Sequence, residues 1–377
     1  MPKARRFRPS MRSSWTLAVL TIVSLVMYLW ANHSRVVRLS PVYEEKLAAA
    51  EWMDAAMDTL RARKFPQIEF LDDINDPNAS TLIGQQFSSI TTEAGDLEAK
   101  WTALNPNMAA VMVDYFHAAG LRSGDVIAVG LTGSLPGMNL AMYAAAQAMG
   151  LEPLVITSTG ASSWGANDPN FTWLDMESIL QHAGMLKQRS IAASIGGGDD
   201  IGRQLSPRGR ELLHDAVDRN KLTLLFTENL EEAVTMRMAW YDDAADDRPI
   251  SLYINIGGGV VSLGYSRNSE LIGEGLIDRL PALNYPRRGV IHAMNVRGIP
   301  VLNVVNIARI ADAFWLPLSP NPLPDPGVGR LFSEVRYNMT ITVAALFIVL
   351  ATLIIVLLFD RRTQRLDRPG ADPDTLL

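Results

Sequence analysis

Two long uncharged runs stand near the two ends of the chain, at Trp15–Ala31 and Met339–Phe359. A helix rises 1.5 Å per residue, so about 20 apolar residues cross the hydrocarbon core of a bilayer. The second run is long enough and the first is at the short limit, and both are predicted to be membrane-spanning helices. A cleaved secretory signal is the alternative for the first run, although Ala31-Asn32-His33 is a poor cleavage site, and a buried core helix is the alternative for the second.

The segment after the first run has helical periodicity. Between Val42 and Lys64, apolar residues recur every three or four positions, at Leu47, Ala50, Met53, Met57 and Leu60. This helix is predicted to form a stalk, whose apolar stripe packs either on the following domain or on a second copy of the chain. Residues 65–80 are rich in Asp, Asn and Pro and are predicted to be irregular. The five prolines between Pro317 and Gly329 predict a semi-rigid linker.

From Asn105 onward, short apolar runs alternate with helical segments that open at Pro or a capping residue and close at Gly or Asn. Apolar strands that alternate with helices indicate a parallel sheet covered on both faces. The predicted fold class is therefore α/β: a doubly wound, mostly parallel sheet with helices on both faces, between two transmembrane helices. The predicted strands are 126–131, 154–157, 191–195, 222–226, 252–256 and 301–305. The predicted division is a cytoplasmic basic tail (1–14), a transmembrane helix (15–31), a stalk helix and connector (32–80), an extracytoplasmic α/β domain (81–316), a Pro-rich linker (317–337), a transmembrane helix (338–359) and a cytoplasmic tail (360–377).

Basic residues flank the outer side of each apolar run. Five precede the first run and four follow the second, whereas two lie close to the inner side of each. The positive-inside rule therefore predicts that both termini are cytoplasmic and that the region between the runs is external. The outer basic residues are Lys3, Arg5, Arg6, Arg8 and Arg12 in one tail, and Arg361, Arg362, Arg365 and Arg368 in the other.

Charge and composition exclude several classes of function. The whole chain carries −6, the first 14 residues carry +5 and the tail from Asp360 is neutral, so residues 32–359 hold −11. A domain this acidic does not attract nucleic acid over its whole surface. The chain has no cysteine, and its five histidines show no H-E-x-x-H spacing. Disulfide, thiolate-zinc and zincin chemistry are therefore not predicted.

Three predicted strands run directly into glycine-rich turns. Ligands of open parallel sheets gather at the carboxyl ends of the strands, so the three turns are predicted to face one crevice. Glycine permits close backbone approach to an anion, although the same glycines also suit plain strand-to-helix turns. No turn matches a Walker or dinucleotide-binding motif, so nucleotide binding is only weakly indicated. The candidate ligand-binding residues are Gly130, Thr132, Gly133 and Ser134 in the first turn, Gly196, Gly197, Gly198, Asp199, Asp200 and Arg203 in the second, and Gly257, Gly258 and Gly259 in the third.

Four residues in or near these turns are candidates for catalysis. Ser134 precedes a helix opened by Pro136 and is a candidate nucleophile, but it lacks the G-x-S-x-G elbow. Asp199 and Asp200 are candidates for a divalent cation site or an acid–base pair, and the alternative is a solvated pair that Arg203 neutralises. Lys100 is a candidate cation for a substrate carboxylate, and the alternative is a surface lysine.

The local context of further polar residues predicts their roles. Ser162, Ser163 and Trp164 follow a predicted strand end and are candidates for a pocket lip, with a packed loop tryptophan as the alternative. Asp175 and Glu177 stand at a helix start, where acidic residues cap the helix. The basic residues Arg203, Arg208 and Arg210 form a local exception to the acidic domain.

Several of these segments occur in an order that resembles the poly-γ-glutamate system protein family, the W component of poly-γ-glutamate synthesis and export. The resemblance covers most of residues 35–330. It implies a protein of the bacterial inner (plasma) membrane that is associated with the genes for synthesis and export of this anionic polymer. It carries over no catalytic residues. The resembling blocks are Ile90-Thr91-Thr92, Leu97-Glu98-Ala99-Lys100, the Gly130–Pro136 turn, Gly160–Asn167, Phe171–Glu177, the Gly196–Gly202 turn and the Gly257–Gly259 turn.

Three functional hypotheses follow. The first is a membrane-anchored external accessory component that binds poly-γ-glutamate, or its synthase and export proteins, at the glycine-lined crevice, with a divalent cation as a candidate cofactor. The second is an external γ-glutamyl amide hydrolase or transferase. The third is a non-catalytic scaffold for synthase subunits, and homo-oligomer formation through the stalk is compatible with each hypothesis.

Overall fold

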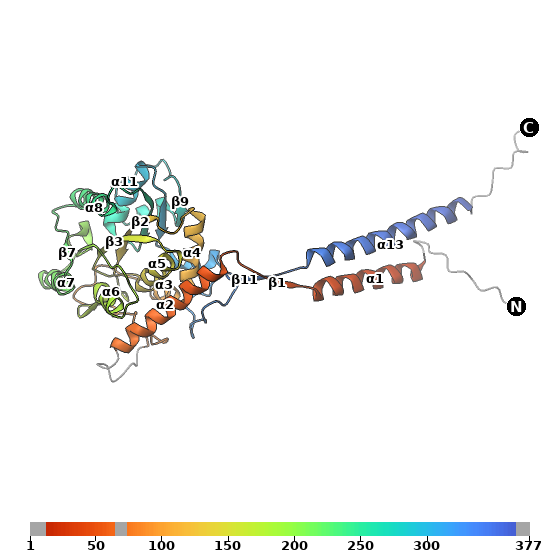
Figure 1. The fold of residues 1–377 in the computed structure, drawn as a ribbon, viewed down its shortest axis with the longest axis horizontal. Helices are drawn as coiled ribbons and strands as arrows, with labels where there is room; N and C mark the ends of the chain where they lie inside the picture. Colours follow the sequence, from red (N-terminus) through yellow and green to blue (C-terminus); the bar gives the residue numbers. More distant parts are fainter. Residues whose placement is uncertain (1–12, 65–73, 367–377) are drawn as a thin grey trace, which may run out of the picture. The chain divides into compact units, whose positions relative to one another are not determined.

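The computed structural model describes residues 13–64 and 74–366, of which 361–366 are described by their backbone alone (Figure 1). The chain divides into one unit built from its two ends and a second unit that spans Ser40–Phe332. The basic residues that predict the membrane orientation lie outside the described side chains. Residues 65–73 of the predicted connector also lie outside the described residues.

The unit of the chain ends contains both apolar helices. Helix α1 spans Ser14–His33 and helix α13 spans Met339–Leu366, and the two pack against each other. Only 6% of the apolar stretch of α1 and 11% of the apolar stretch of α13 is buried. A helix in the core of a soluble protein would be mostly buried. Both are long and apolar enough to cross a membrane, so the structure is compatible with a two-pass membrane protein.

Two short strands adjoin these helices in the same unit. Strand β1 (Val36–Leu39) follows α1 and pairs antiparallel with β11 (Ser333–Arg336), which precedes α13. Strand β11 lies in the segment predicted to be a proline-rich linker. The prolines end at residue 326, and the polar–apolar alternation from Glu334 to Tyr337 suits a strand instead.

The Ser40–Phe332 unit is built around a seven-stranded sheet of order β7-β6-β3-β2-β8-β10-β9. All neighbouring strands are parallel except β9, which pairs antiparallel with β10. The chain builds outward from β2 in one direction and then returns to place β8 on the other side of β2, so the topological switch point lies between these two strands. The predicted doubly wound, mostly parallel fold is confirmed. The strand bounds are β2 Val126–Thr132, β3 Glu152–Ser158, β6 Ala192–Ser194, β7 Thr223–Leu224, β8 Ile250–Ile256, β9 Gly275–Ile277 and β10 Val301–Val304.

Helices cover both faces of the sheet, which explains why the central strands are apolar on both sides. Along β2, Ile127 and Val129 belong to one core cluster while Val126 and Ala128 belong to another. The first face carries α2 (Tyr43–Lys64), α4 (Met108–Ala118), α5 (Pro136–Met149), α6 (Trp173–His182) and α12 (Ile307–Ala313). The second carries α8 (Leu230–Ala245), α9 (Val260–Leu263), α10 (Asn268–Ile272) and α11 (Val290–Val296). The remaining elements are α3 (Leu97–Ala103), β4 (Asn167–Asp168), β5 (Phe171–Thr172), the single turn η2 (Gly198–Asp200) and α7 (Pro207–Arg219).

Helix α2, predicted to be a stalk, is a layer of this unit. The helix packs against α4, α5 and α6 (Figure 1). Met53, Met57 and Leu60 of its apolar stripe are fully buried, and Leu47 is half-buried. The stripe therefore packs within the chain, and the unit begins well before residue 81.

Candidate functional site

The switch-point crevice between the carboxyl ends of β2 and β8 is nearly closed. Its cavity measures about 30 Å³, which is room for about two water molecules. The turns after β2, β6 and β8 do meet there, as their placement at strand ends predicts. The cavity is lined by Thr92, Glu93, Thr132, Ser134, Ser158, Gly160, Gly197, Asp200, Gln204, Gly258, Gly259 and Val260.

One glycine of the first turn, Gly130, and one of the third, Gly257, are explained by packing within the protein. A Cβ on Gly130 would lie 2.5 Å from the Tyr253 hydroxyl oxygen, and one on Gly257 would lie 2.2 Å from Oγ1 of Thr132. Gly257 also has φ +94°, a conformation that side chains rarely adopt. The space that a ligand would need beside these two glycines is therefore filled by protein atoms.

The second turn places two acidic residues in the left-handed region. Asp199 has φ +53° and Asp200 has φ +66°, and such residues cost about 1–3 kcal/mol each unless their surroundings hold them. Asp200 is held by Arg237 of α8, whose Nη2 lies 2.9 Å from Oδ2. The hydroxyls of Ser158 and Ser194 each donate to Asp200 Oδ1 at 2.8 Å. The turn is thus fixed from inside the domain.

Asp199 points the other way and meets two arginines. Arg203 lies 2.5 Å from its Oδ2 and Arg287 lies 2.6 Å from its Oδ1. Both predicted metal-binding carboxylates are therefore paired with guanidinium groups. Within residues 13–64 and 74–360, no group of three or more His, Asp or Glu side chains is arranged to hold a metal ion.

Lys100 is buried beside the crevice rather than exposed on the surface. Its Nζ donates to Ser162 Oγ at 2.8 Å and to the carbonyl oxygen of Ser134. Desolvation lowers the pKa of Lys100 to about 8, against smaller opposing effects of Glu93 and Asp96. A lysine with this pKa is partly neutral near neutral pH and is able to accept a proton.

Glu93 is a site residue that has no signal in the sequence. It lines the crevice, where desolvation raises the pKa of its carboxyl group above the ordinary value, against a smaller opposing effect of the Lys100 charge. No motif surrounds it in the chain, and only the fold brings it to Lys100 and to Ser163, whose backbone N–H donates to its carbonyl oxygen at 2.9 Å.

The predicted pocket lip is packed against the rest of the domain. The backbone N–H of Trp164 donates to the carbonyl oxygen of Gln85 at 2.9 Å, and its indole packs on the main core. Ser134 Oγ accepts from the N–H of Ser162 at 3.0 Å. Among the predicted residues, the structure therefore brings Lys100, Ser134 and Ser162 together.

A larger pocket opens beside the crevice, at the carboxyl ends of β6 and β7. This cationic pocket measures about 500 Å³, a volume in the range of small-ligand sites. Arg203, Arg210 and His214 line it, Leu225 and Ile195 supply apolar surface, and Phe226 is exposed. Its full lining is Ile195, Asp200, Ile201, Arg203, Arg210, His214, Leu224, Leu225, Phe226, Thr227 and Glu228.

Two acidic residues, Asp200 and Glu228, line this pocket as well, and Arg210 is the lining arginine that forms no ion pair with a described residue. Its Nη1 donates to the carbonyl oxygen of Leu205 at 2.7 Å, and no described carboxylate forms an ion pair with it. Arg208, two residues earlier, instead pairs with Glu211 at 2.7 Å on the surface and does not line the pocket. The predicted basic cluster therefore separates into pocket residues and a surface residue.

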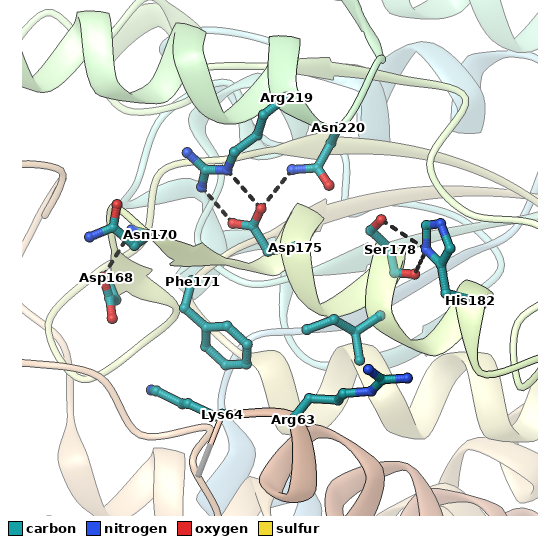
Figure 2. A pocket seen from close by; sticks show the side chains of 11 residues that line it. Arg63, Lys64, Asp168, Asn170, Phe171, Asp175, Ser178, His182, Arg219 and Asn220 are labelled. Atoms are coloured by element: carbon teal, nitrogen blue, oxygen red, sulfur yellow. Dashed lines mark hydrogen bonds and ion pairs between the residues drawn. The ribbon is translucent and has the colours of Figure 1, made fainter. Parts of the chain in front are cut away.

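Another cavity, of about 800 Å³, lies elsewhere and is shown in Figure 2. Asp175 stands in its wall and is bound by Arg219 and by Asn220. Burial alone would raise the pKa of Asp175, but these hydrogen bonds and one from Thr172 lower it overall. The charge of this carboxylate is thus already balanced.

Asp175 and Glu177 have different roles. Asp175 Oδ2 accepts from the N–H of Thr172 at 2.7 Å, which confirms helix capping. For Glu177 the capping prediction is wrong. It is fully buried and accepts from the Tyr143 hydroxyl and the Trp173 indole, each at 2.8 Å, and desolvation raises its pKa.

No family model, curated protein or solved structure matches this chain. The roles of the site residues therefore depend on the geometry described above, and the resemblance to the poly-γ-glutamate system family stays a prediction.

Proposed function

We propose that this chain is a membrane-anchored, externally facing accessory component of poly-γ-glutamate synthesis or export, and that it binds the polymer in the cationic pocket. The observation that carries the proposal is Arg210, which has no ion-pair partner among the described residues and lines a pocket of about 500 Å³ at the carboxyl edge of the sheet. The polymer repeats a carboxylate on a flexible aliphatic chain, and this pocket combines cations with apolar surface.

The pocket also resolves a conflict of charge. Residues 32–359 carry −11, which repels a polyanion at long range. Screening limits that repulsion to about 8–10 Å at physiological salt, so the local charge of Arg210 is able to dominate at contact. The switch-point crevice, with room for about two water molecules, does not admit a polymer.

The binding test compares two arginines on the same helix turn. The full chain is purified into nanodiscs, and binding of γ-glutamate oligomers is measured by calorimetry for the wild type, Arg210→Gln and Arg208→Gln. Loss of a charged hydrogen bond costs about 1.5–3 kcal/mol, so Arg210→Gln is expected to weaken binding about 10- to 100-fold. Arg208→Gln, which removes the same charge outside the pocket, is expected to change it little.

Two results would overturn this assignment. Equal weakening by both variants would show general electrostatic attraction, and absence of binding by the wild type would remove the polymer-binding function.

The membrane placement is a separate part of the proposal. Two apolar helices and the outer basic residues support a two-pass inner-membrane protein with both termini cytoplasmic. The chain lacks cysteine, so single cysteines at Ser10 and Val296 are labelled uniquely by a membrane-impermeant maleimide on intact cells. Labelling of Val296→Cys but not of Ser10→Cys is expected, and the reverse pattern would refute this orientation.

A second candidate function is hydrolysis of γ-glutamyl amides, favoured by the 2.8 Å contact between Lys100 Nζ and Ser162 Oγ. Neutral Lys100 would take the hydroxyl proton as Ser162 Oγ attacks the amide carbonyl carbon, and would pass it to the leaving amine. Water would then hydrolyse the ester and restore Ser162. The crevice has to widen for an amide to enter, and for this reason we place binding first.

Polymer chain length decides between the two functions. If the wild type shortens the polymer and Ser162→Ala does not, the chain is a hydrolase. An unchanged length distribution with the wild type at pH values on both sides of the Lys100 pKa would exclude hydrolysis.

A further inference from the structure

The two strands β1 and β11, here called the juxtamembrane ribbon, have one apolar and one charged face. Side chains alternate between faces along a strand, and residues paired across antiparallel strands share a face. Val37 pairs with Val335 and Leu39 lies on the same side. On the opposite face, Arg38 pairs with Glu334.

The apolar face is uncovered in the described structure. Val37, Val335 and Leu39 are 66%, 64% and 54% exposed. A lone two-stranded ribbon is marginally stable in water, because it buries too little apolar surface. This face therefore requires a partner.

Chain connectivity indicates what that partner is. Helix α1 ends at His33, three residues before the first residue of β1, and β11 ends at Arg336, three residues before α13 begins. Three residues span at most about 11 Å, so the ribbon begins within that distance of the ends of both apolar helices. If those helices cross a bilayer, the ribbon starts in its headgroup layer.

The aromatic residues around the ribbon fit the same layer. Trp30 and Tyr337 are both exposed, and tryptophan and tyrosine are enriched where membrane meets water. Arg35 stacks 4.6 Å from the centre of the Tyr337 ring and donates to its hydroxyl at 2.9 Å.

The charge of the ribbon is opposite to that of the protein as a whole. Its two arginines, Arg38 and Arg336, outnumber its one acidic residue, while the chain carries −6. Arg336 pairs with that residue, Glu334, at 2.5 Å, which leaves Arg38, and Arg35 directly before the ribbon, without a carboxylate partner among the described residues. Juxtamembrane arginines are attracted to anionic lipid headgroups.

We propose that the juxtamembrane ribbon is a lipid-binding element that lies in the membrane interface, with Val37, Val335 and Leu39 against the acyl-chain boundary and its arginines on anionic headgroups. The inference depends on the membrane placement proposed above but not on polymer binding. It gives the chain an anionic-lipid site of its own.

The test uses spin labels on single cysteines in the full chain, in nanodiscs of phosphatidylcholine with or without phosphatidylglycerol. The matched pair is Val37→Cys and Val36→Cys, which are neighbours on opposite faces. Phe347→Cys in α13 is the lipid reference and Val296→Cys is the water reference. Collision with oxygen reports lipid exposure, and collision with a soluble nickel chelate reports water exposure.

The label at position 37 is expected to collide with oxygen and nickel as often as the lipid reference at 347. The label at position 36 is expected to match the water reference at 296. If position 347 is itself water-exposed, the membrane placement fails. If position 347 is in lipid while 36 and 37 are equally exposed to nickel, the ribbon proposal alone is overturned. Spin–spin broadening at position 37 would show that a second copy covers the face, which also overturns it.

A charge variant tests the headgroup part. Arg38→Gln combined with Arg336→Gln is expected to raise the nickel accessibility of position 37 in discs with phosphatidylglycerol and to leave it unchanged in phosphatidylcholine alone. The same change in both lipids would refute recognition of anionic headgroups.

Discussion

Replacement of Lys100 by methionine should remove a pH dependence of stability that the wild-type chain shows above pH 8. In the folded state, desolvation lowers the pKa of Lys100 from 10.5 to about 8. In the unfolded state the side chain is solvated and keeps its ordinary pKa. Between these two values the unfolded state binds more protons than the folded state. The free energy of unfolding therefore rises with pH in this window, and the cost of burying the charge is fully present below it.

The magnitude follows from the two pKa values. Each pH unit in which only the unfolded state is protonated adds about 1.4 kcal/mol. Because the folded lysine is half protonated at its pKa, the gain from about pH 8 to about pH 9.5 is about 1.5 kcal/mol. The range stops there because solvated tyrosines begin to ionise near pH 10.

The assay is urea unfolding of the full chain in detergent, followed by fluorescence of its eight tryptophans. Wild type and Lys100→Met are compared at both pH values, with Lys187→Met as a control that removes an exposed lysine. The wild type and the control should gain about 1.5 kcal/mol relative to Lys100→Met. An equal pH response in all three proteins would show that Lys100 is not buried as a charged group, and the reasoning about this site would fail.

Three further changes test the packing around the site. Asp200→Asn should lower the free energy of unfolding by about 3–5 kcal/mol, because it leaves Arg237 buried without a counter-charge; a loss below about 1 kcal/mol in urea unfolding would contradict the buried pair. The pKa of His292 is lowered to about 4 by desolvation and by Arg288, so stability should fall as pH drops from about 6.5 to about 4, and His292→Asn should flatten that fall in thermal scans. Gly257→Ala should destabilise the fold by at least about 1 kcal/mol, since φ is positive and the new Cβ meets Thr132; an unchanged melting temperature would show that the turn is not constrained.

The architecture was predictable because each element has a local signal. Pro136 stands at the first position of α5, and Ser206 caps α7 by accepting from the N–H of Gly209 at 3.0 Å. The apolar run of β2 has no polar face, and its residues are buried on both sides of the sheet. Such signals depend on residues a few positions apart, so the sequence contains them directly.

The internal supports of the site had no such signal. Arg237 lies in the middle of a helix, and its ion pair joins it to Asp200, 37 residues earlier. Glu93 and Arg287 likewise reach the site only through the fold. A buried arginine and an exposed one look the same in a sequence, because burial is a property of the packed structure. The paired state of Asp199 and Asp200 was for the same reason not predictable beyond the local Arg203.

Whether the glycine turns bind a ligand could not be predicted from the sequence pattern. Glycine at a strand end permits close approach, but the pattern does not say what approaches. Here a side chain of β2, that of Thr132, fills the space beside Gly257, so the crevice at the switch point is narrow. Next to it, β6 and β7 are only three and two residues long, and the chain beyond them diverges around the cationic pocket.

The start of α7 adds a reason to expect an anion in that pocket. The first turn of a helix favours acidic side chains, because its free N–H groups carry partial positive charge. Helix α7 has no acidic residue in its first turn and carries Arg208 and Arg210 there instead. The two arginine charges are repelled by the partial positive charge of the free N–H groups in this turn, and this repulsion lowers helix stability in the absence of an anion. A bound carboxylate would relieve the repulsion at Arg210, so ligand binding and helix stability should be coupled. Addition of γ-glutamate oligomers is therefore expected to slow amide hydrogen exchange in the first turns of α7 in the wild type but not in Arg210→Gln, and equal protection in both would show that the anion binds elsewhere.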